Sequence, residues 1–282
     1  MNDARRLPPE FAGKYGPWAL VAGGSEGVGE SFARMLAAVG INLVLLARRP
    51  GPLDSLADSI RSEHRVQVRT ASVDLTRADL LDQITPLTDD IEVGLMIFNA
   101  GSSIGYNRFP DWKAEDLDFM INLNCHAPVH LAHHYSKGMC ERGRGGLLFL
   151  SSMAGLSGSA WLTIYPATKA FDQMLAEGLW HDLKPAGVDA MCLVLGATKT
   201  PSHAHVDFTK FTPDGGMECD EAAWEGLSHL GLGPLWVAGE GNRARLPEGY
   251  IEQRAVAIDM MSWGTAIIND LEHVPATEAT ES

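Results

Sequence analysis

A short apolar run, Trp18-Ala19-Leu20-Val21-Ala22, leads directly into the glycine-rich segment Gly23-Gly24-Ser25-Glu26-Gly27-Val28-Gly29. The run predicts a buried strand, and the apolar residues after Gly29 recur at helical spacing. Glycines allow a tight turn and close approach to a ligand, while a helix N-terminus offers free N–H groups and a positive dipole end. The segment therefore predicts a strand, turn and helix that cradle a phosphate. Its predicted contact residues are Gly23, Ser25, Glu26, Gly27, Val28 and Gly29.

Further apolar runs alternate with helical patterns along the chain. They are Leu43–Ala47, Val66–Ala71, Val93–Phe98, Leu147–Leu150, Ala190–Leu195 and Leu235–Ala238. Continuously apolar strands separated by helices are typical of a parallel sheet that is covered on both faces. The sequence therefore predicts an α/β, doubly wound Rossmann fold with a mostly or wholly parallel seven-stranded sheet and helices on both faces. Ligands of such sheets bind at the carboxyl ends of the strands.

Length and composition favour one cytoplasmic domain. A chain of 282 residues that is 45% hydrophobic can form a single core, so we expect one dinucleotide-binding and catalytic domain over residues 1–282. The net charge of -14 argues against nucleic acid and anionic lipid as partners. No apolar stretch reaches the roughly 20 residues of a membrane span. The four cysteines lack CxxC spacing, which predicts no metal site and fits a reducing compartment.

Two segments near the C-terminal end depart from the alternating pattern. The irregular stretch that follows the sixth predicted strand indicates a substrate-lid region at about 201–232, because long loops in compact domains usually serve function. The polar, acidic residues 273–282 predict a disordered tail.

The second predicted strand ends in Ala47-Arg48-Arg49. An acidic residue at this place would bind the 2′-hydroxyl of NAD, whereas a guanidinium can bind a 2′-phosphate through paired hydrogen bonds. Arg48 and Arg49 therefore favour NADP(H), and NAD(H) stays possible because Glu26 adds an acid nearby. The alternative is that both arginines are solvated surface residues.

Tyr165-Pro166-Ala167-Thr168-Lys169 places a phenol and an ammonium four residues apart, so both lie on one face of a helix that Pro166 is suited to begin. A tyrosine has an ordinary pKa of about 10, and a nearby cation stabilises its phenolate. Tyr165 can then act as acid and base. A lone pair of this kind is more often structural, so its context decides.

The order and separation of these motifs resemble those of the short-chain dehydrogenases/reductases, in the branch with a single Rossmann domain. The resemblance runs from about Trp18 to Ala238 and rests on Gly23-x-x-x-Gly27-x-Gly29 and on Tyr165-x-x-x-Lys169. It implies a serine thirteen residues before the tyrosine, which selects Ser152 over Ser151 as the residue that positions the substrate oxygen.

The resemblance implies roles for several more residues. Asn124, which shares an apolar helical stripe with Leu117, Ile121, Pro128 and Leu131, would hold a relay water, although it could equally be a buried structural amide. The remaining cofactor contacts that it implies are Asp74, Leu75, Asn99, Ala100, Gly101, Tyr165, Lys169, Gly196, Thr198 and Thr200, with Lys169 on the nicotinamide ribose. Asp74 could equally be an ordinary cap or turn residue, and Asn99-Ala100-Gly101 an ordinary loop start. Leu195 and Thr198 depart from the family pattern at the last segment.

Taken together, the resemblance implies an oxidoreductase that transfers a hydride between NADP(H) and a secondary alcohol or ketone, with Asn124, Ser152, Tyr165 and Lys169 as catalytic residues. Apolar residues before Tyr165 and in the lid region suggest a bulky hydrophobic, steroid-like or acyl-type substrate, although they could equally form core. These residues are Trp161, Leu162, Ile164, Phe208, Phe211 and Met217. The alternatives are an NAD-linked alcohol dehydrogenase and a non-catalytic dinucleotide sensor. Assembly as a homodimer or homotetramer is a further implication of the family.

Overall fold

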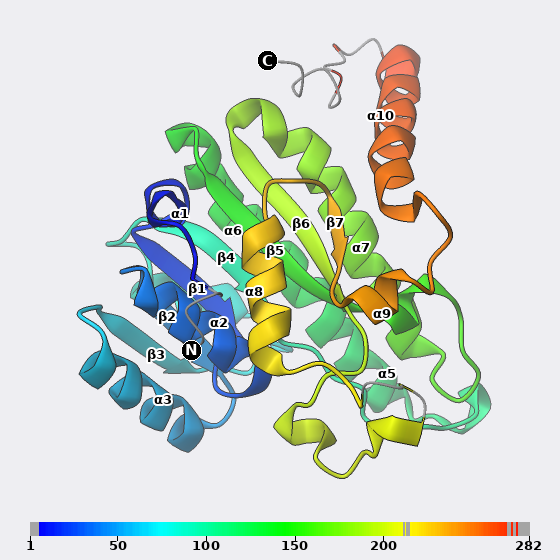
Figure 1. Ribbon diagram of the computed structural model, residues 1–282, viewed down its shortest axis with the longest axis horizontal. Helices are drawn as coiled ribbons and strands as arrows, with labels where there is room; N and C mark the ends of the chain where they lie inside the picture. The colour runs from blue at the N-terminus through cyan, green and yellow to red at the C-terminus, as the bar shows by residue number, and fades with distance from the viewer. Residues whose placement is uncertain (1–5, 211, 213–214, 270–271, 273–274, 276–282) are drawn as a thin grey trace.

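The computed structural model describes residues 6–210, 212, 215–269, 272 and 275 (Figure 1). Phe211 and nearly all of the tail predicted at 273–282 lie outside the described residues.

Seven strands form one sheet in the order β3-β2-β1-β4-β5-β6-β7. Every neighbouring pair is parallel. The strands are β1 (Trp18–Ala22), β2 (Asn42–Ala47), β3 (Val68–Ser72), β4 (Val93–Phe98), β5 (Gly145–Ser152), β6 (Val188–Leu195) and β7 (Leu235–Val237). The predicted doubly wound parallel fold is confirmed. The strand order reverses between β1 and β4, so this is the place where a ligand site is expected.

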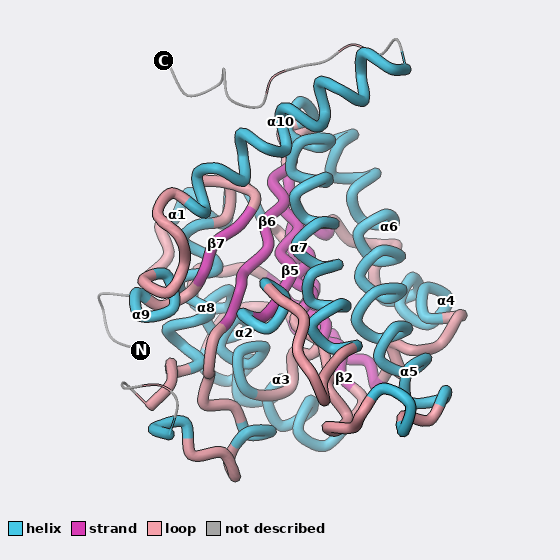
Figure 2. Tube along the Cα trace, turned by 90° about the vertical axis from the view of Figure 1, so that its right-hand side faces the viewer, coloured by secondary structure: helices cyan, strands magenta, loops and turns pink. Residues whose placement is uncertain are grey.

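Helices cover both faces of the sheet, which Figure 2 shows between two helical layers. One layer consists of α1 (Pro9–Tyr15), α2 (Gly27–Ala38), α3 (Pro50–Glu63) and α8 (Cys219–His229). The other consists of α4 (Leu80–Ile84), α5 (Ala114–Ile121), α6 (Ala127–Arg142), α7 (Ile164–Leu183) and α10 (Tyr250–Asn269). The short α9 (Glu240–Arg243) follows β7.

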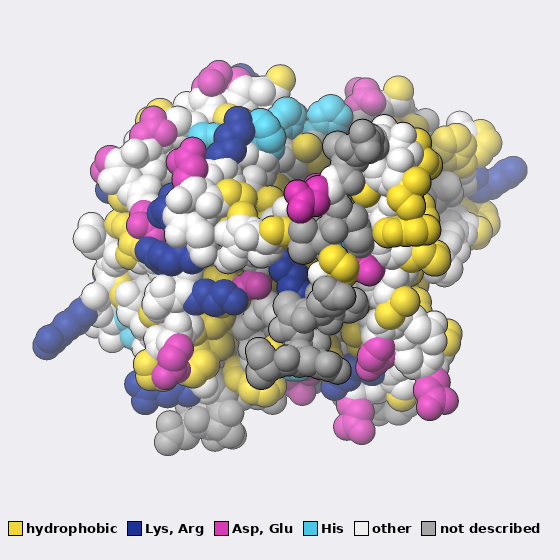
Figure 3. Space-filling view, turned by 90° about the horizontal axis from the view of Figure 1, so that it is seen from above, with side chains coloured by type: hydrophobic (Ala, Val, Ile, Leu, Met, Phe, Trp, Pro, Cys, Tyr) yellow, Lys and Arg dark blue, Asp and Glu magenta, His cyan; other side chains and the backbone are white. Residues whose placement is uncertain are grey.

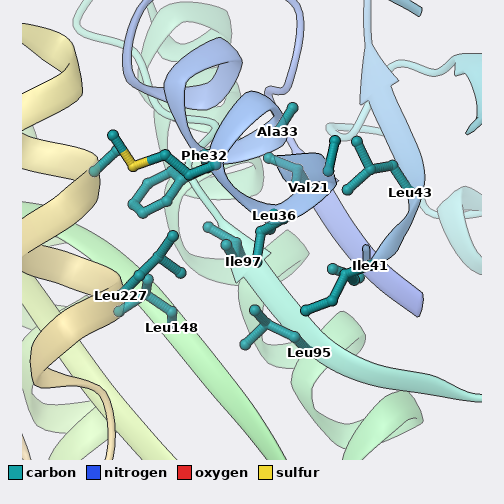
Figure 4. Packing of buried hydrophobic residues seen from close by; sticks show 14 of the residues in the cluster. Val21, Phe32, Ala33, Leu36, Ile41, Leu43, Leu95, Ile97, Leu148 and Leu227 are labelled. Atoms are coloured by element: carbon teal, nitrogen blue, oxygen red, sulfur yellow. The ribbon is translucent and has the colours of Figure 1, made fainter. Parts of the chain in front are cut away.

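Alternate residues of the central strands enter different cores, which explains why these strands are continuously apolar in sequence. Val21 of β1 belongs to the core beneath α2, whereas its neighbours Leu20 and Ala22 belong to the core beneath α6 and α7. Phe32 of α2 and Leu227 of α8 pack in the first of these cores (Figure 4). Burying both faces in this way fixes the position of the carboxyl ends of the strands, where the site lies.

The bounds of five strands differ from the predicted ones, by one residue at β2 and β7 and by up to two residues at β3, β5 and β6. β5 and β6 pair from Gly145↔Val188 to Ser152↔Leu195, which is longer than the apolar runs, because a backbone ladder does not require apolar side chains. β3 begins at Val68 instead of Val66. The backbone N–H of Gln67 is bonded to the side chain of Asn42 and not to a neighbouring strand.

The start of α7 is a second correction. The helix begins at Ile164, two residues before Pro166, so the proline lies within the first turn. Proline lacks a backbone N–H, but this costs no hydrogen bond there, because the first N–H groups of a helix have no acceptors within the helix.

The predicted lid region at 201–232 contains two kinds of structure. Its first part holds single 3-10 turns at Pro201–His203 and Phe208–Lys210. Its second part includes α8, whose Ala222 and Leu227 are buried in the core with α2. Within the described residues, no helix is long and apolar enough to cross a membrane.

Candidate active site

A hollow of about 730 Å³ runs along the carboxyl ends of the central strands. It brings together the glycine turn after β1, the end of β2, the loop after β4 and the start of α7. Its lining includes Gly23, Ser25, Glu26, Gly27, Val28, Arg48, Arg49, Leu75, Asn99, Ala100, Gly101, Tyr165, Lys169 and Thr200. The predicted residues Gly29, Asp74, Asn124, Ser152, Gly196 and Thr198 are not in this lining.

The glycine turn is held by close backbone contacts. Gly23 has φ +80°, and a Cβ there would lie 2.8 Å from the Ala100 nitrogen. A Cβ on Gly29 would lie 2.0 Å from the Gly23 oxygen, which itself accepts a hydrogen bond of 2.7 Å from Asn99 Nδ2. Only glycine fits both places. Gly23 and Gly27 line the hollow at the N-terminus of α2, and this arrangement fits a pyrophosphate.

Two arginines at the end of β2 lie in different settings. The Arg49 guanidinium is 2.5 Å from the Glu26 carboxylate in an exposed ion pair. The Arg48 guanidinium lies over the Phe119 ring, 5.6 Å from its centroid, and is exposed. Arg48 also lines a second hollow of about 470 Å³ together with Asp74 and Arg77. Arg48 is thus the more available of the two for an anionic ligand.

Asp74 makes local hydrogen bonds. Its carboxylate accepts from the Thr76 hydroxyl at 2.7 Å and from the Thr76 N–H at 3.0 Å. These bonds hold the pKa of the Asp74 carboxyl below its usual value. The turn-forming alternative for Asp74 is therefore realised in the structure, and the residue still faces the second hollow.

Lys169 lies at the inner wall of the larger hollow and is only 4% exposed. Its Nζ donates to the Leu150 carbonyl oxygen at 2.8 Å and to Asp172 Oδ2 at 2.9 Å. Burial opposes the charge of Lys169, but the Asp172 carboxylate and Tyr165 outweigh this and raise the pKa of the lysine. The ammonium is thus held one helical turn from Tyr165.

The two serines at the end of β5 have different partners. The Ser151 hydroxyl is buried, donates to the Lys169 backbone oxygen at 2.6 Å and accepts from Gln173 at 3.1 Å. The Ser152 hydroxyl is partly exposed and accepts from the Ala154 N–H at 3.1 Å. That bond leaves the Ser152 proton available to another acceptor, whereas Ser151 is occupied.

Asn124 lies in a π-helical turn, Asn122–His126, between α5 and α6. Its side chain is fully buried, and its Oδ1 accepts from the Ser102 N–H at 3.1 Å. Its Nδ2 donates to the Ser102 carbonyl at 3.1 Å and to Thr168 Oγ1 at 3.0 Å.

The expected helical stripe through Asn124 is only partly correct. Leu131 is buried, but Ile121 is 38% exposed. A π turn inserts a residue, so the faces of α5 before the turn and of α6 after it are out of register, and Ile121 does not continue the stripe of Asn124 and Leu131.

The loop after β6 contains three predicted cofactor contacts, which differ in whether they face the hollow. Thr200 lies beside Gly27, since a Cβ on that glycine would be 3.5 Å from the threonine Cβ. Thr198 is buried and donates to the Gly196 oxygen at 3.1 Å. Gly196 itself packs closely against Asn242, which would be 2.4 Å from an added Cβ. Only Thr200 of the three faces the hollow.

Asp172 is the buried partner of Lys169 behind the hollow, and it was not among the predicted residues. It is fully buried on α7, and its burial raises the pKa of its carboxyl to about 6 against the opposing effect of Lys169. The signal was the spacing Lys169-x-x-Asp172, which puts a carboxylate on the lysine's own helical face. Within the described residues, no group of three His, Cys, Asp or Glu side chains could hold a metal ion.

The glycine turn, Tyr165 and Lys169 thus line one hollow at the carboxyl ends of the strands of a Rossmann sheet. The short chain dehydrogenase family model matches residues 17–209, which contain the glycine turn and Tyr165 with Lys169. The chain belongs to the short-chain dehydrogenase/reductase family.

Known relatives have related activities. A 7beta-hydroxysteroid dehydrogenase of Collinsella aerofaciens is 33% identical over 189 residues, which are 67% of this chain and 72% of the relative. A short-chain dehydrogenase from Sphingobium yanoikuyae, solved in complex with NADPH, is 30% identical with a TM-score of 0.73, over 93% of this chain and 99% of that one. A bulky-bulky ketone specific alcohol dehydrogenase from Comamonas testosteroni is 27% identical with a TM-score of 0.72, over 94% and 99% of the two chains.

Proposed function

We propose that this chain is an NADP(H)-preferring oxidoreductase that interconverts a secondary alcohol and a ketone, with Tyr165 as general acid and base. The observation that supports this most directly is that Tyr165 and Lys169 line the same hollow as the glycine turn. A proton-transfer group and a dinucleotide cradle therefore face one space, as direct transfer to a substrate requires.

The residues around the hollow fit a nicotinamide dinucleotide. The turn from Gly23 to Gly29 would hold the pyrophosphate, and Arg48 the adenosine end. Asp74, Leu75 and Asn99-Ala100-Gly101 would lie near the adenine and its ribose, while Thr200 would orient the carboxamide. When bound, the cofactor supplies or accepts the hydride.

Within this proposal each polar side chain has a separate task. Tyr165 transfers the proton to and from the substrate oxygen, and Ser152 holds that oxygen with its free hydroxyl proton. The Lys169 ammonium stabilises the phenolate by its charge, an attraction of about 4 kcal/mol at 4 Å in a dielectric of 20 before solvent screening.

Asn124 would hold a relay water beside Lys169. Its amide oxygen accepts one hydrogen bond from Ser102 and has a second lone pair. A Cβ on Gly101 would lie 3.6 Å from that oxygen and 2.9 Å from the lysine Nζ, so the two groups face the same small region.

The proposed NADP(H) preference rests on Arg48, which is exposed and lines both hollows. The relative from Sphingobium yanoikuyae binds NADPH, which supports the same choice. Arg49 is paired with the Glu26 carboxylate and is therefore less available to a phosphate, so NAD(H) is the alternative cofactor. Initial rates with NADPH and NADH at equal concentration test this, and faster turnover with NADH would contradict it.

A bulky hydrophobic substrate, steroid-like or acyl-type, fits the apolar side chains near Tyr165. Trp161 is 58% exposed, and its carbonyl oxygen accepts from the Asn107 N–H at 2.9 Å, which places the exposed Tyr106 nearby. Two relatives act on a hydroxysteroid and on bulky-bulky ketones. Cofactor absorbance measured with a panel of small and bulky ketones would identify the substrate class.

The mechanism is tested by Tyr165→Phe, which removes one hydroxyl. We expect turnover to fall by about 100-fold or more, since positioned acid–base groups contribute on the order of 10²–10⁴. NADPH binding, followed by its fluorescence, should change little. A Tyr165→Phe variant that turns over at the unaltered rate would overturn the mechanism.

The proposal also includes a cytoplasmic protein that assembles as a homodimer or homotetramer. Large apolar side chains of α10 are exposed, among them Met260, Met261, Trp263 and Ile268. Figure 3 shows hydrophobic side chains gathered along the right-hand edge of the molecule seen from above. Light scattering on the purified chain measures the assembly, and a monomer would contradict this part.

A further inference from the structure

The buried ion pair between Lys169 and Asp172 lies directly behind the proposed site. The two charged groups are 2.9 Å apart, and their side chains are 6% and 0% exposed. Lys169 lines the hollow, whereas Asp172 does not. The ammonium therefore separates the ligand space from a carboxylate inside the protein.

Local structure does not explain why an aspartate occupies this place. Asp172 lies in the interior of α7, where aspartate is a poor helix former, and it is too far from the helix start to cap it. Within the described residues, its Oδ1 has no hydrogen-bond partner. A buried carboxylate is costly unless it is paired, and its ion-pair partner is Lys169.

Lys169 has the corresponding need for a counter-charge. Burial of a lysine favours the neutral amine, and shifts of up to about 3–5 pH units occur for fully buried groups. The other hydrogen-bond acceptor of Lys169, the Leu150 carbonyl oxygen, is neutral and cannot serve as the counter-charge. Asp172 is the main influence that raises the pKa of Lys169 against burial.

We propose that Asp172 is a positioning residue that keeps Lys169 as a charged ammonium, held in place one turn from Tyr165, and so acts on the reaction through the lysine. This inference rests on the proposed function for its catalytic consequence. The charge state of Lys169, however, can be measured in the protein without substrate.

Several other titratable groups face this pair and belong to the same electrostatic unit. Tyr165 lies on α7 itself, Cys125 on the π-helical turn and Cys192 on β6. Burial raises the pKa of the Cys125 thiol to about 11 and that of the Cys192 thiol well above its usual value. Both thiols are therefore neutral near pH 7, which leaves Asp172 as the counter-charge.

The direct test is the ionisation of Lys169 in the full chain, followed by NMR of ¹³C-lysine-labelled protein. The Lys169 signal is identified by its loss in Lys169→Met. We expect the unaltered protein to keep this lysine protonated above pH 10, and Asp172→Asn to lower the midpoint by about two pH units. A Lys169 midpoint below pH 9 in the unaltered protein would overturn the proposal without reference to any variant of Asp172.

Glu177→Gln is the matched control. Glu177 is a second buried carboxylate of α7, and it pairs with Arg254 instead of Lys169. This substitution should leave the Lys169 midpoint unchanged. An equal shift in Asp172→Asn and Glu177→Gln, or no shift in either, would contradict a specific role of Asp172.

The rate of alcohol oxidation against pH gives the second measurement. In Asp172→Asn we expect a falling limb at the pH where Lys169 loses its proton, whereas a purely structural role would lower stability and leave the profile in place. If Asp172→Asn instead moved only the rising limb of the profile, toward lower pH, the Asp172 carboxylate would be weakening the stabilisation of the Tyr165 phenolate by Lys169. That result would also overturn the proposal. If the unaltered chain turned over no alcohol or ketone, the proposed function would fail, while the NMR midpoint would still decide the role of Asp172.

Discussion

Two ion pairs that contribute residues to the lining of the same hollow differ in burial. At the end of β2, Glu26 and Arg49 pair at 2.5 Å with side chains that are 41% and 60% exposed. On α7, Lys169 and Asp172 pair at 2.9 Å with side chains that are almost completely buried. A ligand in the hollow can reach and rearrange the charges of the exposed pair. The charges of the buried pair are fixed against each other by the fold.

The physical reason is solvent. An exposed pair typically contributes about 0.2–1 kcal/mol, because water and salt screen it. A buried pair is costly to desolvate, yet the loss of one partner leaves an uncompensated charge that costs about 3–5 kcal/mol. Selectivity for a cofactor phosphate is therefore easier to change at the exposed end, whereas changes at the buried end should affect both stability and chemistry.

The largest expected effect comes from breaking the buried pair with Asp172→Leu. We expect the free energy of unfolding to fall by about 3–5 kcal/mol near pH 7, because the Lys169 ammonium is left without a counter-charge. Urea unfolding measures this.

The double variant Lys169→Met with Asp172→Leu removes both charges and should recover most of the lost stability, since apolar replacements of buried pairs are often neutral or better. If the double variant were as unstable as Asp172→Leu, packing and not charge would be responsible for the loss.

An intermediate effect is expected for Arg48→Asp, which reverses an exposed charge that lines both hollows. Loss of a hydrogen bond to a charged group costs about 1.5–3 kcal/mol, so the Kd for NADPH should rise by about 10-fold to 100-fold, with a smaller change for NADH. Fluorescence titration with both cofactors checks this. Arg65→Asp, at an exposed arginine outside both linings, is the control, and equal losses for the two cofactors would refute a role in 2′-phosphate binding.

The smallest effect is expected for Glu26→Gln, which dissolves the exposed pair. Stability should change by less than about 1 kcal/mol. NADPH binding should tighten by a few-fold at low salt and lose that gain at high salt, because Arg49 becomes free to meet a phosphate and salt screens exposed charges. A loss of stability as large as that of Asp172→Leu would contradict the contrast between the two pairs.

Much of the fold and part of the candidate site could be predicted from short stretches of sequence. The glycine turn and the Tyr165–Lys169 spacing are local patterns, because each of them acts over a few neighbouring residues. Strand boundaries were less accurate, because the pairing of β5 with β6 depends on backbone partners that are distant in the chain. The departure of Asn124 from a regular helical stripe follows from a π turn, which the spacing of apolar residues does not predict.

The sequence by itself determined the sheet, the glycine turn and the pair of residues on α7, since strand alternation, glycine geometry and helical spacing act over a few residues. Only the tertiary structure decided how these residues are held. It is the fold that sets Asn99 against Gly23, occupies Ser151 while leaving the Ser152 proton free, and buries Asp172 beside Lys169. These contacts join segments that are far apart in the chain or depend on the exclusion of water, and burial is a property of the assembled core.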